Sequence, residues 1–529
     1  MPSPAKPKWW DDVVSADSVK LTDDVFLLWG DRVRVLQRDQ ATKRSRVYAR
    51  GAVGWVDDSD LGGEALLEFY FIDVGQGDGI LLVTPEGHHL LIDGGLERSR
   101  QQTGKSAADF VDWKFSTDYV LFGERGDATK NVVRLDAMIA SHADWDHYGG
   151  LRDLIDRDTK AYAEELDSLD VTVEAFYHPG LCPQEDGTDE LGEKDGDHFV
   201  RLMGDRGSVE KGLGNDPDGE PRIRGFWKTF MSAVTKQKTS AGQPTPITRL
   251  SQKSEFLPGF AVTDNDSGVT IRVLAPIEED INGKPGLKDL GDEGYNKNGH
   301  SVALRLDYKD RRFLLTGDLN DRSHELIIDS YADKQAFEAD WSADVAKACH
   351  HGSHHVDRRF LQGVHALATV FSSGDANTYD HPRAWVLGAA ALYGRVIEAH
   401  DHRLKAPLVY ATEVARSIAL RGVDQLREYE NPQTYGPEKE GPTKTVSGKV
   451  TVSKWRVVLD RDSAAAPDLP PAAAVRAMRT LIYGLVNVRT DGKRLLFAVR
   501  NEGNHSWAIE TIEDTEIATA FRMEKPANR

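Results

Sequence analysis

The stretch IASHADWDHYGGL, residues 139–151, decides how the rest of the chain is interpreted. Between an apolar lead-in and a Gly-Gly turn it holds four side chains that can bind a metal, namely His142, Asp144, Asp146 and His147. Imidazole nitrogens and carboxylate oxygens are the donors that hydrolytic divalent metals use. A polar surface loop would explain the same residues, and a loop this short cannot complete a metal site alone. The rest of the chain has to supply the other ligands.

Length, composition and charge limit the classes of protein to consider. The chain has 529 residues, enough for roughly three or four domains of about 150 residues each. Apolar residues make up 40%, an ordinary globular composition, and the net charge of -19 disfavours a loose attraction of the whole surface to nucleic acid. Only two cysteines occur, so no disulfide framework is expected. The N-terminus has no apolar segment of a secretory signal, and we find no run of about 18 apolar residues. We therefore expect a cytoplasmic protein that does not span a membrane.

The chain divides into four parts by its sequence patterns. Residues 1–22 are polar and are expected to be a flexible N-terminus. Residues 23–63 contain short β-prone runs and end in a Gly-Trp-Val motif that resembles bacterial SH3-like modules. Residues 64–462 form the main domain, with an acidic and Gly-rich insertion at about 183–265. Residues 463–529 begin with the Pro-rich linker 463–471, after which residues 472–484 predict a helix and the following residues a β-hairpin with its turn in Thr-Asp-Gly-Lys.

Further candidate ligands lie at the ends of apolar, β-prone runs. Asp318 ends RRFLLTGDL, His350 and His351 follow DVAKAC, and His381 stands in YDHPR after ALATVFSS. The first motif itself follows the apolar run VVRLDAMIA. A site with two metal ions needs several such ligands, with about 4 Å between the ions. Because loops at strand ends can converge, and a random scatter of His and Asp would not follow strands repeatedly, the sequence predicts a metal centre.

The order of the motifs resembles the metallo-β-lactamase superfamily. Within that superfamily the chain is similar to the soluble hydrolase domain of ComEC-type DNA-uptake proteins over roughly residues 66–415. The motifs that carry the resemblance are FIDVGQGDGILL, LLIDGG, SHADWDHYGGL, NGHSVALRL, LLTGDL, KACHHGSHH and GDANTYDHP. The resemblance implies an α/β fold, an αββα sandwich with the metals at one edge. The membrane channel of the competence proteins is missing from this sequence, so DNA uptake does not carry over.

The same resemblance implies a role for each residue of the site. His142 and Asp144 would bind one ion, Asp146 and His147 would bind the other, and Asp318 would bridge both. His350 or His351 would complete a ligand shell. Many superfamily members have His at the position of Asp144, and the additional carboxylate favours Mn²⁺ over Zn²⁺. The expected cofactors are therefore two divalent metal ions, Zn²⁺ or Mn²⁺.

Other residues have open or supporting roles. His178 in FYHPG is either a further metal ligand or a turn residue with no role. Asp93 in LLIDGG would support the metal-binding loop through hydrogen bonds. Asp78 is expected to face the site, and Asn377 and His381 match a late motif that would contact the substrate phosphate or the metal shell.

The expected chemistry is hydrolysis. Two cations lower the pKa of a shared water from about 16 towards neutrality, and the resulting hydroxide attacks an electrophile. Asp318 would orient this group and shuttle its proton, and Asp146, Asp78, Asn377 and His381 complete the catalytic candidates. The ComEC-type resemblance favours phosphodiesters, so the leading hypothesis is a metal-dependent phosphodiesterase, in particular a nuclease.

Two alternatives stay open. The substrate is a small phosphodiester, such as a cyclic nucleotide or a phosphocholine ester. Alternatively, the chain is a binding or scaffold protein with a vestigial metal site, which recruits a protein partner through the SH3-like or C-terminal module. Residues 221–254 contain basic residues and aromatics and no acid before Glu255. This segment is either a strip that follows substrate phosphates or a basic surface element that balances its acidic flanks.

Overall fold

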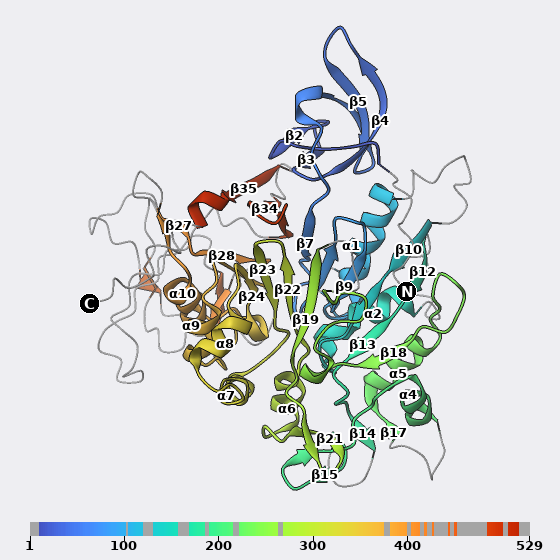
Figure 1. Ribbon diagram of the computed structural model, residues 1–529, viewed down its shortest axis with the longest axis vertical. Coiled ribbons are helices and arrows are strands. Elements are labelled where there is room, and N and C mark those ends of the chain that lie inside the picture. The colour runs from blue at the N-terminus through green and yellow to red at the C-terminus, as the bar shows by residue number, and fades with distance from the viewer. Residues whose placement is uncertain are drawn as a thin grey trace.

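The computed structural model of the chain is shown in Figure 1. It describes residues 10–101, 104–119, 131–156, 169–185, 190–214, 222–262, 268–374, 381–398, 404–412, 484–500 and 506–517, and the short strands at 417–419, 426–427, 443–444 and 449–451. No helix in these ranges is long and apolar enough to cross a membrane.

Two β-sheets form the centre of the main domain. The larger sheet has nine strands, in the order β18 (Ile247–Arg249), β13 (Phe176–His178), β11 (Ala137–Ile139), β9 (His89–Ile92), β8 (Ile80–Val83), β7 (Leu67–Phe71), β33 (Val486–Thr490), β34 (Leu495–Arg500) and β35 (Trp507–Ile512). The smaller sheet has six strands, in the order β19 (Val269–Ala275), β22 (Ala303–Tyr308), β23 (Arg311–Leu315), β24 (Val345–Lys347), β25 (Ala368–Phe371) and β28 (Leu408–Ala411). Both sheets are mixed, with parallel strands from β9 to β18 and from β23 to β28.

The two sheets pack face to face around one apolar core. In β7, Phe69 and Phe71 belong to the core between the sheets, whereas Tyr70 belongs to the core on the outer face. The ring centroids of Phe69 and Phe313, from opposite sheets, lie 4.4 Å apart. Since successive side chains of a strand point to opposite faces, a continuous apolar run marks a strand covered on both sides.

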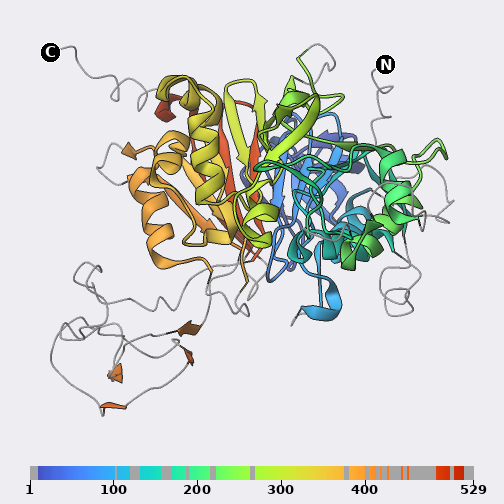
Figure 2. The same ribbon diagram turned by 90° about the horizontal axis from the view of Figure 1, so that it is seen from below.

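Helices cover the outer faces of both sheets, as Figure 2 shows. On the larger sheet these are α1 (Ala107–Lys114), α2 (Trp145–Ile155) and α5 (Gly225–Thr235). On the smaller sheet these are α7 (Asp321–Asp329), α8 (Lys334–Trp341), α9 (Arg358–Val364) and α10 (Ala384–Tyr393). This arrangement of mixed sheets and outer helices is consistent with the predicted α/β sandwich.

The remaining elements are short. Helix α4 (Arg206–Leu213) lies near the paired strands β14 (Gln184–Glu185) and β17 (Arg222–Ile223). Helix α6 (Glu293–Gly299) lies near β15 (Lys194–Asp195) and β21 (Lys284–Lys288), which form a small sheet with β16 (His198–Phe199) and β20 (Glu279–Ile281). Outside these are β10 (Asn131–Leu135), β12 (Leu169–Val173), β26 (Ile397–Glu398), β27 (Leu404–Ala406), β29 (Ser417–Ala419), β30 (Leu426–Arg427), β31 (Thr443–Lys444) and β32 (Lys449–Thr451). Short 3-10 helices form η1 (Asp58–Asp60), η2 (Arg98–Arg100), η4 (Gln252–Ser254) and η5 (Cys349–Gly352), and a short π-helix forms η3 (Phe115–Tyr119).

Two segments that the sequence pattern sets apart contribute strands to the larger sheet. Strand β18, inside the expected insertion at 183–265, pairs in parallel with β13 and forms one edge. The predicted C-terminal hairpin forms β33 and β34, and β33 pairs with β7, with Val486 opposite Phe71. The hairpin therefore extends the central sheet instead of standing apart from it. The helix predicted at 472–484 lies almost entirely outside the described residues.

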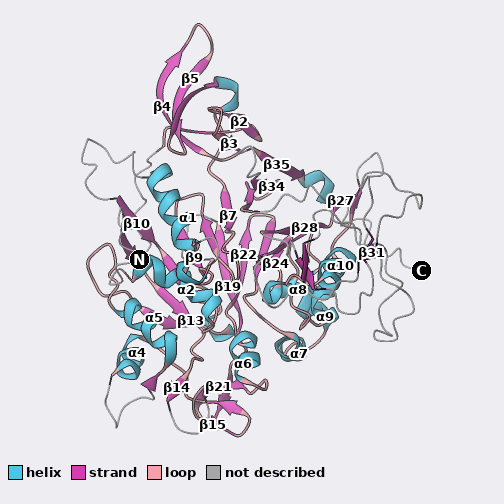
Figure 3. Cartoon of the chain, turned by 180° about the vertical axis from the view of Figure 1, so that it is seen from behind, coloured by secondary structure: helices cyan, strands magenta, loops and turns pink. Residues whose placement is uncertain are grey.

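The N-terminal part forms a small β module with its own core, above β34 and β35 in Figure 3. Its strands are β1 (Asp12–Val13), β2 (Ser18–Lys20), β3 (Phe26–Leu28), β4 (Arg32–Asp39), β5 (Arg44–Ala49) and β6 (Ala52–Asp57). Strand β1 pairs with β4, and β2 pairs with β3. Paired β-structure thus begins at Asp12, inside the segment expected to be flexible, because Val14 and Leu21 are buried in the core of the module.

Candidate metal centre

The candidate metal-binding loops meet at one edge of the two facing sheets. Strands β9 and β11 of the larger sheet end next to each other, and so do β23 and β24 of the smaller sheet. Each strand is followed directly by a segment that carries predicted site residues: Asp93, the loop 140–147, Asp318, and the pair His350 and His351. Parallel strands bring their carboxyl ends to the same edge, so these segments converge although up to 258 positions separate Asp93 from His351 in the chain.

Helix α2 begins inside the first motif. The side chain of Asp144 caps it, accepting a hydrogen bond from the backbone nitrogen of Trp145 at 3.0 Å. Asp146 lies in the first turn, where a negative charge interacts favourably with the helix dipole. At Gly150 an added Cβ atom would overlap the carbonyl oxygen of Gly94. The Gly-Gly pair of the motif lies inside α2 and does not form the expected turn; it is needed for α2 to touch the loop after β9, and this contact places His147 beside Asp93.

Four buried side chains form a compact group in which a metal ion could be held. In Asp78, His147, Asp318 and His351, one potential donor atom of each lies within 4.8 Å of all the others. Nε2 of His147 and Nε2 of His351 are 3.2 Å and 3.0 Å from Oδ2 of Asp318, and 3.3 Å from each other. The carboxylate of Asp146 lies 3.8–3.9 Å from the same two nitrogens. Two imidazoles and two carboxylates therefore surround one point.

Nδ1 of each imidazole is engaged behind the ring, and Nε2 of each faces the carboxylate of Asp318. Nδ1 of His147 lies 2.8 Å from Oδ2 of Asp93. Nδ1 of His351 lies 3.0 Å from the carbonyl oxygen of Ser372 and 3.1 Å from Oδ1 of Asp78. Carboxylate and carbonyl oxygens only accept, so Nδ1 is the donor in both rings. This is the hydrogen-bonding state of metal-binding histidines, which are held by a carboxylate or carbonyl behind the ring.

Asp78 belongs to the group by distance; its Oδ2 is paired with Lys347, and its buried Oδ1 has no hydrogen-bond partner among the described residues. The ammonium of Lys347, itself fully buried, contacts Oδ2 of Asp78 and donates to the carbonyl oxygen of Gly317 at 2.7 Å. Burial by itself would raise the pKa of Asp78, but Lys347 and His351 outweigh it and hold that pKa below its usual value. We therefore interpret Asp78 as an anionic group that positions His351, with Lys347 balancing its charge.

His142 offers a further buried nitrogen next to the group. Its Nδ1 lies 3.0 Å from Oγ of Ser141 and 3.2 Å from Oγ of Ser301. Within the described residues, its buried Nε2 has no hydrogen-bond partner. The ring centroids of His142 and His147 are 4.0 Å apart, and burial together with the charge of His147 lowers the pKa of His142 well below its usual value. A neutral imidazole with an unused buried nitrogen fits a second cation.

Asp144 and His350 lie at the rim of the group. Asp144 is partly exposed, and its Oδ1 is 3.6 Å from Nζ of Lys297. Nε2 of His350 is 3.8 Å from Oδ2 of Asp318 and accepts from the amide of Asn298 at 3.3 Å. Between the two consecutive histidines, the structure brings His351 into the group. Both have left-handed backbones, with φ of 46° and 52°, a strained conformation that is concentrated at functional sites.

The remaining predicted residues are not brought into the group. His178 ends β13, and its Nδ1 accepts from the backbone nitrogen of Gly180 at 3.1 Å, which leaves the proton of the neutral ring on Nε2. Burial and Arg249 lower its pKa to about 3. The ring of His381 lies 5.8 Å from that of His350, and burial together with His351 lowers its pKa to about 3. Asn377 lies outside the described residues.

Sequence reasoning missed Lys347 and Gln76. Lys347 stands in the apolar run before His350, and a lysine there is a usable signal, because lysine is almost never fully buried unless it is paired. Gln76 lies in the turn before β8, and its amide donates to Oδ2 of Asp146 at 3.2 Å. A glutamine in a Gly-rich turn carries no such signal, since turns commonly hold polar residues.

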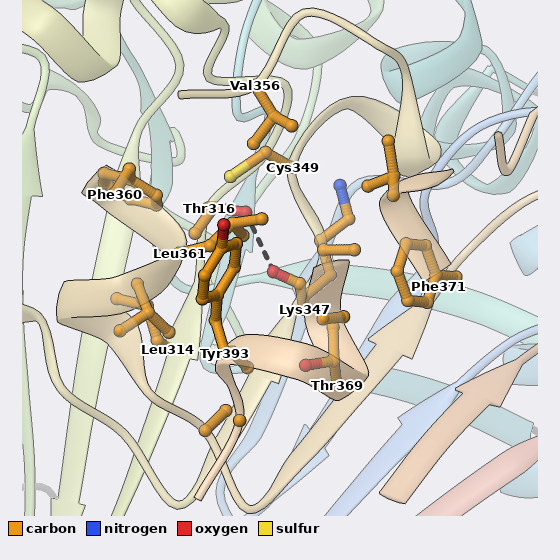
Figure 4. A pocket seen from close by; sticks show the side chains of 17 residues that line it. Leu314, Thr316, Lys347, Cys349, Val356, Phe360, Leu361, Thr369, Phe371 and Tyr393 are labelled. Atoms are coloured by element: carbon orange, nitrogen blue, oxygen red, sulfur yellow. Dashed lines mark hydrogen bonds between the residues drawn. The ribbon is translucent and has the colours of Figure 1, made fainter. Parts of the chain in front are cut away.

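An apolar cavity lies on the other side of β24 (Figure 4). It is lined by Leu314, Phe360 and Tyr393 among others, and the nitrogen of Lys347 points away from it. Cys349 also lines the cavity, and burial raises the pKa of its thiol to about 11, so the thiol is not activated. The cavity therefore belongs to the packing of α9 and α10 on the sheet.

The basic segment at 221–254 is largely structural where it is described. Trp227 and Phe230 are 2% and 0% exposed and pack around Tyr148 of α2. Arg224 pairs with Glu190 at 3.0 Å, and Arg249 pairs with Glu278. The burial of Trp227 and Phe230 and the pairing of Arg224 and Arg249 favour the alternative in which the segment balances acidic neighbours, although Phe226 of the same segment is 53% exposed.

Comparison with known proteins places the site inside a recognised family region. Residues 72–358, more than half of the 529-residue chain, match the family model of the metallo-beta-lactamase superfamily. The match contains all four residues of the buried group as well as His142, Asp146 and Asp93. No curated protein matches the chain.

Proposed function

Because the chain belongs to the metallo-beta-lactamase superfamily, whose members are mostly hydrolases, we propose that it is a metal-dependent hydrolase of phosphodiester bonds. The observation that carries the proposal is the convergence of two Nε2 atoms, from His147 and His351, on the carboxylate of Asp318. The order of the sequence motifs, which resembles that of ComEC-type hydrolase domains, supports phosphodiesters as substrates and a nuclease as the specific activity.

The side chains divide into two sets that would each hold a divalent ion, Zn²⁺ or Mn²⁺. His147, His351 and Asp146 would hold one ion, His142 and Asp144 would hold the other, and Asp318 would be shared. When bound, such ions supply positive charge that lowers the pKa of water and stabilises the negative charge that develops on the phosphate. Mixed imidazole and carboxylate donors suit both metals.

The chain's own residues hold the reacting groups in place. Burial by itself would raise the pKa of Asp318, but His351 and His147 outweigh it and keep that pKa well below its usual value. Asp318 therefore stays ionised and can accept and pass on a proton from water, while its backbone nitrogen donates to Oγ of Ser301 at 3.0 Å. The side-chain amide of Gln76 orients Asp146 by donating a hydrogen bond to its carboxylate.

A small phosphodiester is the second candidate substrate. The net charge of -19 and the pairing of Arg224 and Arg249 with acids provide no broad basic surface for a long nucleic acid. A scaffold with a vestigial site fits less well, because the buried group retains its imidazoles, carboxylates and the hydrogen bonds behind them.

The proposal is tested with purified full-length protein and bis-p-nitrophenyl phosphate. We expect close to two divalent ions per chain by elemental analysis, and hydrolysis that a chelator abolishes. The Asp318→Asn variant should lower kcat by about 10³-fold, since loss of a shared carboxylate costs several kcal/mol of transition-state stabilisation.

The matched control is Asp310→Asn, which changes an exposed aspartate in the turn between β22 and β23. It should keep wild-type activity, and circular dichroism should show both variants folded. Undiminished activity of folded Asp318→Asn, or of metal-free protein, would contradict the proposal.

A further inference from the structure

An aromatic pair lies beside the predicted metal-binding loop. Trp145 is the first residue of α2, and Phe226 lies at the start of α5; their ring centroids are 4.1 Å apart and their planes are inclined at 66°. The guanidinium of Arg100, from η2, lies 4.8 Å from the Trp145 ring centroid and 5.2 Å from that of Phe226. We name these three residues the aromatic platform.

Phe226 and Arg100 of the platform are open to solvent, and Trp145 is partly buried beside them. Phe226 is 53% exposed, whereas its neighbours Trp227 and Phe230 are buried. Half of the Arg100 side chain is also exposed, although its Nε lies 3.3 Å from Glu97. One exposed apolar residue is ordinary on a protein surface. A ring held against a second ring and a guanidinium is instead a preformed surface on which a planar group can stack.

The platform is adjacent to the site along the chain. Trp145 stands between Asp144 and Asp146, the residues proposed to serve the two ions. A chain of ion pairs also links Phe226 to the rim of the site. Lys297 lies 3.6 Å from Asp144 and 3.3 Å from Glu293, and Glu293 lies 3.9 Å from Arg224, two residues before Phe226. The platform therefore lies beside the rim that Asp144 forms.

The charges near the platform do not form a track for a phosphate backbone. Arg224 lies 3.0 Å from Glu190, and Lys297 lies 3.3 Å from Glu293 and 3.6 Å from Asp144. Arg100 faces Glu97. Each of these cations has an acidic partner, so phosphates beyond the scissile one gain little from them. Stacking on the platform is a form of recognition that does not depend on these paired charges.

We propose that the aromatic platform receives an unpaired nucleobase attached to the phosphate that is hydrolysed. This inference rests on the proposed phosphodiesterase function and narrows its substrate to nucleotide-containing diesters. Every base has a face that stacks on an aromatic ring, so the preference is tolerant of sequence. In a duplex these faces are covered by neighbouring bases, so single strands and short nucleotides are the substrates and duplexes are not.

Two esters with the same leaving group test this inference on the metal-loaded full-length protein. They are thymidine 5′-(p-nitrophenyl) phosphate, which carries a base, and methyl p-nitrophenyl phosphate, which does not. For wild type, we expect the kcat/KM of the thymidine ester to exceed that of the methyl ester by roughly tenfold, mostly through KM. Phe226→Leu, which keeps apolar volume but removes the ring, should reduce this ratio to about one, and Phe226→Tyr should restore it.

The control is Trp113→Leu, which removes an aromatic exposed to 37% on α1 and should leave the ratio unchanged. The proposed role of the platform is wrong if wild type hydrolyses both esters with equal kcat/KM, or if Phe226→Leu does not alter the ratio. Either result leaves the proposed phosphodiesterase function intact. If wild type hydrolyses neither ester, the proposed function fails and the inference fails with it.

Discussion

Asp93 holds the imidazole of His147, and Asp78 together with Ser372 holds that of His351, in both cases through Nδ1. These contacts decide which nitrogen of each ring faces Asp318. Lys347 in turn balances the charge of Asp78 in a place without solvent. The candidate metal centre thus depends on side chains behind the donors as well as on the donors.

The role of Asp93 leads to a prediction about metal affinity. Asp93→Asn keeps the size of the side chain, and asparagine tolerates the left-handed φ of 58° at this position. The amide is a weaker acceptor than a carboxylate, so the imidazole of His147 becomes less basic and less well oriented. We expect the affinity for Zn²⁺ or Mn²⁺ to fall by about 10–100-fold, measured by competition with a chelator.

Asp73→Asn is the matched control in the neighbouring turn. The Asp73 carboxylate accepts from the backbone nitrogen of Gly75 at 3.2 Å, and Asp73 is not one of the four residues of the buried group. The metal affinity of the Asp73→Asn variant should equal that of wild type. Equal affinities for both variants would show that the carboxylate behind His147 is unimportant.

At the level of elements, the site depends on how closely α2 approaches the loop after β9. The backbone nitrogen of Gly94 donates to the carbonyl oxygen of His147 at 2.7 Å, and that of Gly150 donates to Gly95 at 2.9 Å. These bonds require the two backbones to touch, which only glycine permits at Gly94 and Gly150. The Gly-Gly sequence of the motif therefore serves packing, whereas the acids and histidines before it serve chemistry.

Gly150→Ala separates these two effects. Alanine favours a helix by up to about 1 kcal/mol over glycine, yet here its Cβ would overlap the Gly94 carbonyl and push α2 away from Asp93. We expect lower thermal stability and at least a tenfold loss of kcat/KM, measured by differential scanning calorimetry and phosphodiester hydrolysis.

Gly388→Ala provides the comparison within another helix. Gly388 lies in α10, and an added Cβ atom there meets nothing within 4 Å. This variant should be slightly more stable than wild type and fully active. If Gly150→Ala behaves like Gly388→Ala, the close approach of α2 is not required.

At the level of the whole molecule, one buried arginine joins three parts of the chain. Arg489 of β33 lies 2.8 Å from Asp31 of the N-terminal module and 3.3 Å from Glu68 of β7. It also donates to the carbonyl oxygen of Trp29 at 2.6 Å. Arg489 is 0% exposed, so these contacts are made in a place with little water. The C-terminal hairpin, the module and the main sheet therefore share one ionic cluster.

Removing Arg489 should destabilise the whole molecule. Arg489→Met leaves Asp31 and Glu68 with fewer cations, and we expect the free energy of unfolding at pH 7 to fall by about 3–5 kcal/mol in urea titrations. The control Lys334→Met removes an exposed partner of Glu338 and should change the free energy of unfolding by less than about 1 kcal/mol.

The pH dependence of this loss follows from the two carboxylates. Burial by itself raises the pKa of Asp31 and of Glu68, but Arg489, with Arg50 and Arg32, outweighs it and lowers both. A carboxylate whose pKa is lower in the folded state than in the unfolded state stabilises the protein at pH values above its unfolded pKa of about 4. This stabilisation is lost as the pH falls from there towards the folded-state pKa. In Arg489→Met burial prevails, so protonation no longer costs stability. The difference from wild type should therefore shrink between pH 7 and pH 3.5, and a constant difference would contradict this account.

The sequence alone determined the strands and the kind of chemistry. The apolar runs before Asp318 and His350 predicted buried strands, which β23 and β24 are, because a strand covered on both faces has no polar alternation. Metal-binding side chains after such runs predicted donors at one sheet edge, and the order of the motifs predicted the superfamily that the family model shows.

Only the tertiary structure decided which side chains meet. The choice of His351 over His350 depends on two left-handed residues, and the roles of Lys347 and Gln76 depend on contacts with Asp78 and Asp146. The placement of the C-terminal hairpin beside β7 joins segments more than 400 residues apart, with Asn487 donating to the carbonyl oxygen of Phe69 across 418 positions. Local sequence patterns report periodicity and turn chemistry over a few residues, whereas such partners are chosen by packing between distant segments, which no local pattern records.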